Sequence, residues 1–291
     1  MSFEDNYQEI FALVSKDIDQ IKIAMRSAVN NCPWINDDLI DMFNAPSKFI
    51  RSTVTLLYLK SLELDINKNI IELLCAVELI HNASLIHDDI IDNSDIRRGI
   101  STLNKKFSSK VAVLAGDYIL SIAMQKLVKL EPREISLMFS ETLENMTKGE
   151  LNQFFTRFKM PNLESYIEKS RNKTAKLFEV SLNSTILNSG IECENASEFA
   201  KNFGIAFQIR DDLMNILNAS YGKPTKSDIK GGIYTAAVIF SKGKDIDRDA
   251  IEKTYLLLNN YIDQALLALK NLNENKYKRA LIKLSKILGN E

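Results

Sequence analysis

Residues 66–92 read INKNIIELLCAVELIHNASLIHDDIID, an apolar stretch that ends in a cluster of aspartates. Its apolar residues recur at helical spacing and cover much of the circumference, a pattern typical of a helix buried inside a bundle. Asp88 and Asp92 are four residues apart and share one helical face, with Asp89 beside them. Carboxylates this close together repel one another, and burying them without partners is unfavourable. A bound divalent cation would relieve both effects.

The same helical period returns in six further segments, near residues 47–61, 110–131, 134–158, 163–187, 196–217 and 246–270. The 291 residues include only 10 Gly and 5 Pro, too few turn formers for a many-stranded sheet. The sequence contains no internal repeat and no linker rich in Gly, Pro or Ser. We therefore predict an all-α bundle that forms a single domain over residues 1–291.

Charge and cysteine content narrow the classes of protein to be considered. Lys and Arg total 37 against 38 Asp and Glu, so the formal charge of −1 argues against a nucleic-acid partner. Three widely spaced cysteines suit reduced thiols in a cytosolic protein. No cationic and apolar signal segment is visible, and no apolar run approaches the ~20 residues that span a bilayer. We predict a cytoplasmic protein without stable membrane insertion.

Magnesium suits the aspartate cluster because it takes hard oxygen ligands and uses one or two carboxylates, with substrate phosphates completing its shell. Arg97 and Arg98 follow this helix and offer forked donors to the same phosphates. The alternative is a solvated acidic helix end whose charge the two arginines balance. The cluster by itself leaves both interpretations open.

A second acidic cluster lies on the predicted helix near 196–217. Gln208, Asp211, Asp212 and Asn215 fall at positions i, i+3, i+4 and i+7, so one face of an otherwise apolar helix is polar. Two acidic faces on separate buried helices could hold metal ions on both sides of a diphosphate. A charged stripe on a surface helix is the alternative, and it fits poorly with the apolar flank.

The stretch from His81 to Gly116, HNASLIHDDIIDNSDIRRGISTLNKKFSSKVAVLAG, resembles the first aspartate-rich region of trans-polyprenyl diphosphate synthases. The stretch FQIRDDLMN, from Phe207 to Asn215, resembles their second aspartate-rich region. The likeness extends, with gaps, from about Lys48 to Thr235. It implies the isoprenoid synthase fold, a bundle of mostly antiparallel helices around a deep central cavity, usually as a homodimer.

The resemblance also implies roles for individual residues. Magnesium, about three ions with bound diphosphate, would be held by Asp88 and Asp92 on one wall and by Asp211 and Asp212 on the other. The allylic diphosphate would be bound by Arg97, Lys173, Thr174, Gln208 and Lys223. Isopentenyl diphosphate, which has no metal of its own, would be bound by Lys48, Arg51, His81 and Arg98. Catalysis would depend on Asp88, Asp92, Arg97, Lys173 and Asp211.

Side-chain size near the first cluster bears on product length. Ser84 lies one turn before Asp88, with Ala83 beside it, and both are small. In the family an aromatic residue at this level accompanies farnesyl-length products, whereas small residues accompany longer ones. Met124 matches a position where a bulky residue closes the product shaft in some long-chain members. We predict a hexaprenyl to octaprenyl product for a quinone side chain, with a short-chain farnesyl or geranylgeranyl synthase as the alternative.

Three departures from the family pattern leave a further function open. Asn215 replaces the last aspartate of the second cluster, and residues 46–52, PSKFIRS, keep only the two basic positions of the usual G-G-K-R-x-R-P. Residues 232–235, GIYT, lack the usual lysine of G-K-x-T. A weakly active partner subunit of a heteromeric synthase is consistent with these losses.

A class I terpene cyclase is the third interpretation, because such enzymes also ionise allylic diphosphates with metal held by acidic helices. A cyclase has no use for a second diphosphate pocket. Lys48, Arg51 and Arg98 therefore count against it.

Overall fold

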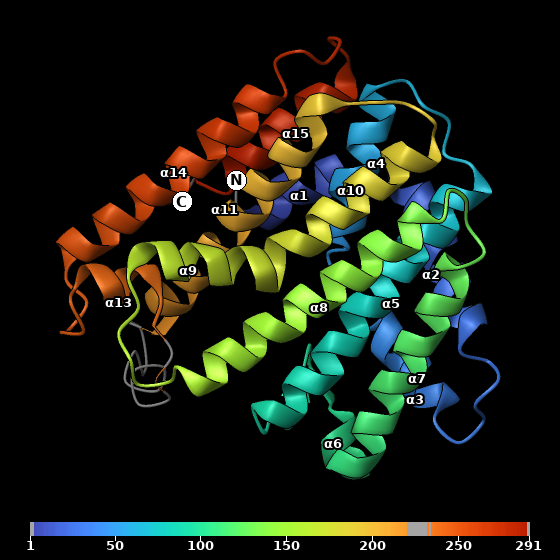
Figure 1. Cartoon of the computed structure of the whole chain (residues 1–291), viewed down its shortest axis with the longest axis horizontal. Helices are drawn as coiled ribbons and strands as arrows, with labels where there is room; N and C mark the ends of the chain where they lie inside the picture. The colour runs from blue at the N-terminus through green and yellow to red at the C-terminus, as the bar shows by residue number, and fades with distance from the viewer. Residues whose placement is uncertain (1–2, 220–231, 233, 290–291) are drawn as a thin grey trace. The chain divides into compact units, whose positions relative to one another are not determined.

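Helices make up most of the protein in a computed structural model that describes residues 3–219, 232 and 234–289 (Figure 1). They are α1 (Phe3–Phe11), α2 (Ser15–Ala28), α3 (Asn36–Asn44), α4 (Ile50–Ser61), α5 (Lys68–Ile91), α6 (Leu103–Lys106), α7 (Ser109–Leu127), α8 (Glu134–Phe155), α9 (Leu163–Ser170), the π-helix η1 (Arg171–Ala175), α10 (Lys176–Asn188), α11 (Glu194–Ala219), α13 (Ala236–Phe240), α14 (Arg248–Ala268) and α15 (Lys276–Ile287). Within the described residues, the strands are β1 (Ile96–Arg97) and β2 (Ile100–Ser101), which pair antiparallel. The prediction of an all-α protein is confirmed.

The chain forms two compact units, and each is discontinuous in sequence. One, which we call the α5 unit, comprises Phe11–Met138 and Ser184–Ile191. The other, the α11 unit, comprises Met1–Ile10, Phe139–Asn183 and Glu192–Glu291. The single domain over residues 1–291 stays a prediction.

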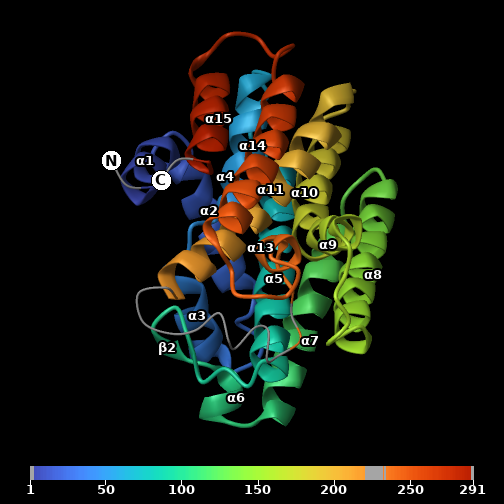
Figure 2. The same cartoon turned by 90° about the vertical axis from the view of Figure 1, so that its left-hand side faces the viewer.

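The α5 unit is built on the long helix α5, which packs against α7 and α2. Asn67 starts α5 by accepting a hydrogen bond from the Ile70 backbone N–H at 3.1 Å. α5 and α7 lie side by side in both views (Figures 1 and 2). Gly116 of α7 leaves room for the ring of His87 on α5, because a Cβ at this position would overlap that ring.

Burial explains the apolar character of α5. In the part of the chain that the structure describes, α5 is the one helix long and apolar enough to cross a membrane, but 72% of its most apolar window is buried within the protein. Cys75 on this helix is fully buried, and burial raises the pKa of its thiol to about 12. Cys32, Cys75 and Cys193 are thiols outside any disulfide.

The α11 unit is built on α11, which packs against α14 and against η1. Gly204 permits the close approach of η1, because a Cβ at this position would lie 2.6 Å from Ala175 Cα. Phe178, Phe199 and Phe203 form part of the core, and the Phe178 and Phe203 rings meet edge to face with centroids 5.5 Å apart. The π-helix η1 interrupts the regular helical register between α9 and α10, a feature often found at functional sites.

Candidate active site

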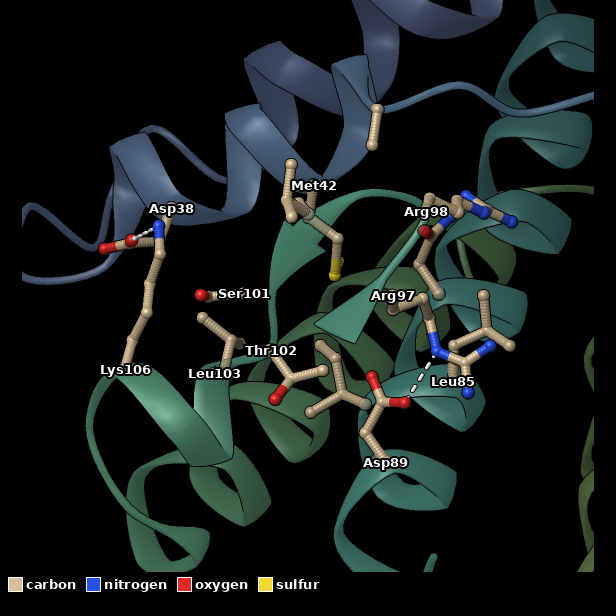
Figure 3. A pocket seen from close by; sticks show the side chains of 14 residues that line it. Asp38, Met42, Leu85, Asp89, Arg97, Arg98, Ser101, Thr102, Leu103 and Lys106 are labelled. Carbon is tan, nitrogen blue, oxygen red and sulfur yellow. Dashed lines mark hydrogen bonds and ion pairs between the residues drawn. The ribbon is translucent and has the colours of Figure 1, made fainter. Parts of the chain in front are cut away.

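The first acidic cluster lies at the C-terminal end of α5, where the negative end of the helix dipole adds to the field of the carboxylates. Asp88 is half-buried, Asp92 is exposed at the C-cap, and Asp89 is buried. Asp89 Oδ1 accepts a hydrogen bond from Arg97 Nε at 2.7 Å (Figure 3). Burial raises the pKa of Asp89, and the bonded Arg97 opposes that rise. Asp89 is therefore tied to Arg97 and buried, whereas Asp88 and Asp92 are the more exposed carboxylates of the cluster.

The donor set at this helix end fits magnesium. Within the described residues, no three His, Cys, Asp or Glu side chains are grouped closely enough to hold a metal ion by themselves. Magnesium requires only one or two protein carboxylates when substrate phosphates supply the remaining oxygens. Asp88 and Asp92, one helical turn apart, meet that requirement.

The β1–β2 hairpin sets the positions of the two arginines. Arg97 pairs with Ile100 across the hairpin, and the two intervening residues, Arg98 and Gly99, have φ of +51° and +82°. A two-residue hairpin turn with both φ values positive matches the twist of its strands, and Gly99 adopts it without strain. The turn places Arg97 beside Asp89 and brings Arg98 near Glu78.

A small pocket opens beside these arginines (Figure 3). Arg97, Arg98 and Asp89 line it together with apolar side chains that include Met42 and Leu85. The ion pair between Lys106 Nζ and Asp38 Oδ1, 2.8 Å apart, lies at its other side. The predicted isopentenyl diphosphate residues Lys48, Arg51 and His81 do not line this pocket.

Arg51, His81 and Arg98, which the sequence assigned to one diphosphate pocket, lie close enough for their charges to interact. The pKa of His81 is held well below its ordinary 6.5, first by burial and then by the positive charges of Arg51, Arg98 and Arg97. A neutral imidazole still offers one N–H donor to an anion. Lys48 is exposed just before α4, and its place in this pocket stays a prediction.

Glu78 lies close to Arg51 and Arg98 and supplies an acidic group beside them. The sequence pattern did not predict this residue as part of the site. Its side chain is only 2% exposed, and Ser52 Oγ donates a hydrogen bond to Glu78 Oε1 at 2.6 Å. Burial raises the pKa of Glu78, whereas Ser52 and the charges of Arg51 and Arg98 oppose the rise. The available signal was a glutamate one turn before His81 in an otherwise apolar helix.

Replacing His81 with Gln should change how the stability of the protein depends on pH. Because the folded-state pKa lies below 6.5, the unfolded chain binds more protons as the pH falls through that value. The wild type should therefore lose stability on acidification below pH 6.5, by up to about 1.4 kcal/mol per pH unit. His81→Gln should remove this part of the slope in urea unfolding measured at a series of pH values. His87→Gln is the matched control, since the chain has only 2 histidines, and an unchanged slope in His81→Gln would contradict the assignment.

The second acidic cluster forms a hydrogen-bonded chain within the α11 unit. Thr174 Oγ1 donates to Gln208 Oε1 at 2.5 Å, and Gln208 Nε2 donates to Asp212 Oδ1 at 2.8 Å. Tyr166 OH donates to the other carboxylate oxygen, Asp212 Oδ2, at 2.7 Å. Burial and the charge of Asp212 raise the pKa of Tyr166 well above its ordinary value, so the phenol remains a donor. The position of Asp212 is thus fixed from both sides, with Asp211 half-buried beside it.

Lys173 lies next to this chain on the π-helix. Its Nζ pairs with Glu150 Oε1 on α8 at 2.6 Å. The structure thus brings Thr174 and Gln208 into contact and places Lys173 beside them. The sequence prediction missed Tyr166 and Glu150, because nothing in the local pattern reveals which helices meet in the fold. Lys223 lies outside the described residues, as does Ile233.

The first cluster belongs to the α5 unit and the second to the α11 unit. Their opposition across one diphosphate therefore stays a prediction.

Comparison with known proteins agrees with these features. A family profile described as "Polyprenyl synthetase" matches residues 32–266. A prenyl transferase of Cyanophora paradoxa is 32% identical over 95% of this chain and 96% of its own length. Solanesyl diphosphate synthase 1 of Arabidopsis thaliana, a chloroplastic protein, is 34% identical over 80% of this chain and 60% of its own length. The crystal structure of a polyprenyl synthase from Caulobacter crescentus, complexed with calcium and isoprenyl diphosphate, has a TM-score of 0.86 at 21% identity and covers 98% of both chains.

Proposed function

Because this chain belongs to the polyprenyl synthetase family, we propose that it condenses an allylic diphosphate with isopentenyl diphosphate, head to tail and in trans, to give a long-chain polyprenyl diphosphate. Family membership confirms that the chain is a prenyltransferase and that its all-α structure is the isoprenoid synthase fold. The longer product is supported by the likeness to a solanesyl diphosphate synthase.

One observation within the α5 unit carries this proposal. A single helix, α5, presents His81 among arginines and, two turns further on, the carboxylates of Asp88 and Asp92. Asp88 is seven positions beyond His81, a rise of about 10 Å along the helix. This arrangement suits one diphosphate bound by cationic side chains and a second bound through metal. A terpene cyclase would need only the second.

The chain's own residues would bind and orient the two substrates. The allylic diphosphate would be held by Lys173, Thr174 and Gln208. Arg97 would join them once it replaces its hydrogen bond to Asp89 with one to a phosphate oxygen. Bound magnesium would supply the positive charge that stabilises the departing diphosphate. Placed donors and charges of this kind are the main source of rate acceleration when charge develops on a leaving group.

Arg51, His81 and Arg98 would position isopentenyl diphosphate so that its double bond reaches the allylic carbon. The allylic carbon–oxygen bond breaks first and leaves an allylic cation and diphosphate. The double bond of isopentenyl diphosphate attacks this cation to form the new carbon–carbon bond, and the resulting cation loses a proton, which we assign to the released diphosphate, to restore an alkene. No protein nucleophile is required. The apolar surroundings of α5 would exclude water, which would otherwise capture the allylic cation.

Product length gives a test of individual residues within the α5 unit. His87 lies beside Gly116 and Asp117 of α7, and Lys126 pairs with Glu72, so the two helices run antiparallel. Because of this register, Met124 on α7 lies beside a part of α5 that is closer to the N-terminus of α5 than Ser84 is. Met124 is therefore farther from Asp88 than Ser84 is. A product growing along these helices would pass the small Ala83 and Ser84 and meet Met124 later.

Ser84→Phe should therefore shorten the product, and Ala83→Phe should act in the same direction. Met124→Ala should lengthen it, as read from the size of the extracted polyprenols. Ser121→Phe, at an exposed position of α7, is the control and should leave the length distribution unchanged. An unchanged distribution for Met124→Ala would contradict its assignment as the floor of the shaft.

The assay that tests the function combines the purified chain with magnesium, labelled isopentenyl diphosphate, and geranyl, farnesyl or geranylgeranyl diphosphate in turn. We expect extracted lipids of long chain length. Farnesyl or geranylgeranyl products would support the short-chain alternative. Product only in the presence of a second subunit would indicate a heteromeric synthase, and turnover without isopentenyl diphosphate would indicate a cyclase. We also propose a homodimer located in the cytoplasm, a state that light scattering and cell fractionation can check.

A further inference from the structure

The end of α8 and the turn that follows it carry a cluster of exposed apolar side chains. Phe154, Phe155 and Phe158 are 58%, 74% and 67% exposed, and Leu151 and Met160 are also exposed. We call residues Leu151–Met160 the α8 tip. Single exposed apolar residues are common on protein surfaces, but several large ones within ten residues mark an interaction site.

The backbone of the α8 tip directs these side chains outward. Leu151, Phe154 and Phe155 fall at positions i, i+3 and i+4 and so share one helical face. Phe158 follows in the left-handed conformation, φ +66°, which bulky residues rarely adopt unless their surroundings impose it. Gly232 is packed against this turn, because a Cβ at Gly232 would lie 2.7 Å from the Phe158 backbone nitrogen.

Basic side chains are interleaved with the exposed rings. From Leu151 to Leu163 the chain contains Arg157 and Lys159 and no acidic residue. The Arg157 guanidinium lies 5.2 Å from the centroid of the Phe154 ring, so cation and aromatic ring are already in contact. Aromatic rings with neighbouring Lys and Arg side chains are the composition that binds the interface of an anionic membrane.

We propose that the α8 tip is a docking surface for an anionic lipid bilayer. The charge favours a bilayer over a second copy of the chain, because the basic residues between the rings complement anionic lipid, whereas the same surface on a second copy carries the same positive charge and no acidic partner. The choice of a bilayer also rests on the proposed function, since a long polyprenyl chain is apolar and is taken up by lipid. Glu150, the residue just before the α8 tip, pairs with Lys173 of the candidate active site. The docking surface therefore begins one residue beyond a glutamate that contacts a proposed diphosphate-binding residue on η1.

Sedimentation with vesicles tests this proposal on the full chain. Vesicles of equal parts phosphatidylglycerol and phosphatidylcholine should carry the wild type down, and vesicles of phosphatidylcholine alone should carry much less. Phe154→Ser/Phe155→Ser/Phe158→Ser should weaken binding at least about tenfold. Arg157→Gln/Lys159→Gln should weaken it about thirtyfold at low salt, at roughly one kcal/mol for each basic residue.

Two controls and a separate activity assay make the outcome decisive. Leu256→Ser/Leu267→Ser removes apolar side chains of similar exposure on α14, and Lys129→Gln/Arg133→Gln removes two exposed charges elsewhere; both should bind like the wild type. Prenyl transfer in detergent without vesicles should be unchanged in all variants, so loss of transfer in the wild type would refute only the proposed function. Wild-type binding by both α8-tip variants would overturn the docking proposal. A second result would also overturn it: the wild type does not bind vesicles, and the triple variant has a different oligomeric mass. That result would identify the α8 tip as a contact between copies of the chain.

Discussion

Asp88→Ala should lower kcat for prenyl transfer by about a thousandfold or more. The proposed site uses Asp88 and Asp92 to hold magnesium against the departing diphosphate, and metal stabilisation of charge in the transition state contributes several kcal/mol. Asp89 is a poor substitute, because its carboxylate is buried and bonded to Arg97 at 2.7 Å. The magnesium concentration that gives half-maximal activity should rise in parallel. Initial rates across a magnesium titration measure both effects.

Asp95→Ala is the matched control for this variant. Asp95 lies seven residues further along the chain, where its exposed carboxylate pairs with Lys105 at 3.0 Å. The control removes a carboxylate from the same acidic region and should retain nearly full activity. Near-normal turnover by Asp88→Ala, at an unchanged magnesium requirement, would remove the basis for the metal assignment.

Much of the fold could be predicted because its helices are long and strongly periodic. The stretch 66–92 became α5 (Lys68–Ile91), and 110–131 became α7 (Ser109–Leu127). The predicted helix over 134–158 ends earlier, at Phe155, because Phe158 takes a left-handed conformation in the turn beyond it. Apolar periodicity does not detect such a turn, since Phe154, Phe155 and Phe158 continue the helical spacing.

The predicted helix over 163–187 illustrates a second limit. The structure divides this stretch into α9, the π-helix η1 and α10. A single π-helical turn changes the direction in which all following side chains of the helix point. The amino-acid composition of this turn, Arg171–Ala175, does not differ from that of an ordinary α-helix. Lys173 and Thr174 were assigned to the site by family resemblance alone, and their place on η1 was visible only in the structure.

The site residues that belong to a sequence motif could be predicted. The site residues that join the site only through a tertiary contact could not. Asp88, Arg98 and Asp212 stand in recognisable motifs. Tyr166 and Glu150 do not, because each contacts its partner from a different helix of the α11 unit. Such partners decide which carboxylates are held in place by the protein and which remain accessible to ligands.

Asp212→Ala should lower kcat by about a hundredfold and also destabilise the protein. Asp212 accepts hydrogen bonds from Tyr166 OH and Gln208 Nε2, so its removal leaves two donors without their acceptor. An unsatisfied buried donor costs about 1–3 kcal/mol, which urea unfolding measures. Asp212→Asn keeps the size and one acceptor oxygen, and it should restore part of the stability without restoring the rate, because the negative charge that we propose binds magnesium is still missing.

Tyr166 allows the two roles of this network to be separated. Tyr166→Phe removes the hydroxyl that fixes Asp212 Oδ2 and should reduce kcat about tenfold while the carboxylate stays charged. If Tyr166 acts only by positioning Asp212, the double variant Tyr166→Phe/Asp212→Asn should be no slower than Asp212→Asn alone. Multiplicative losses in the double variant would show that Tyr166 acts independently of Asp212.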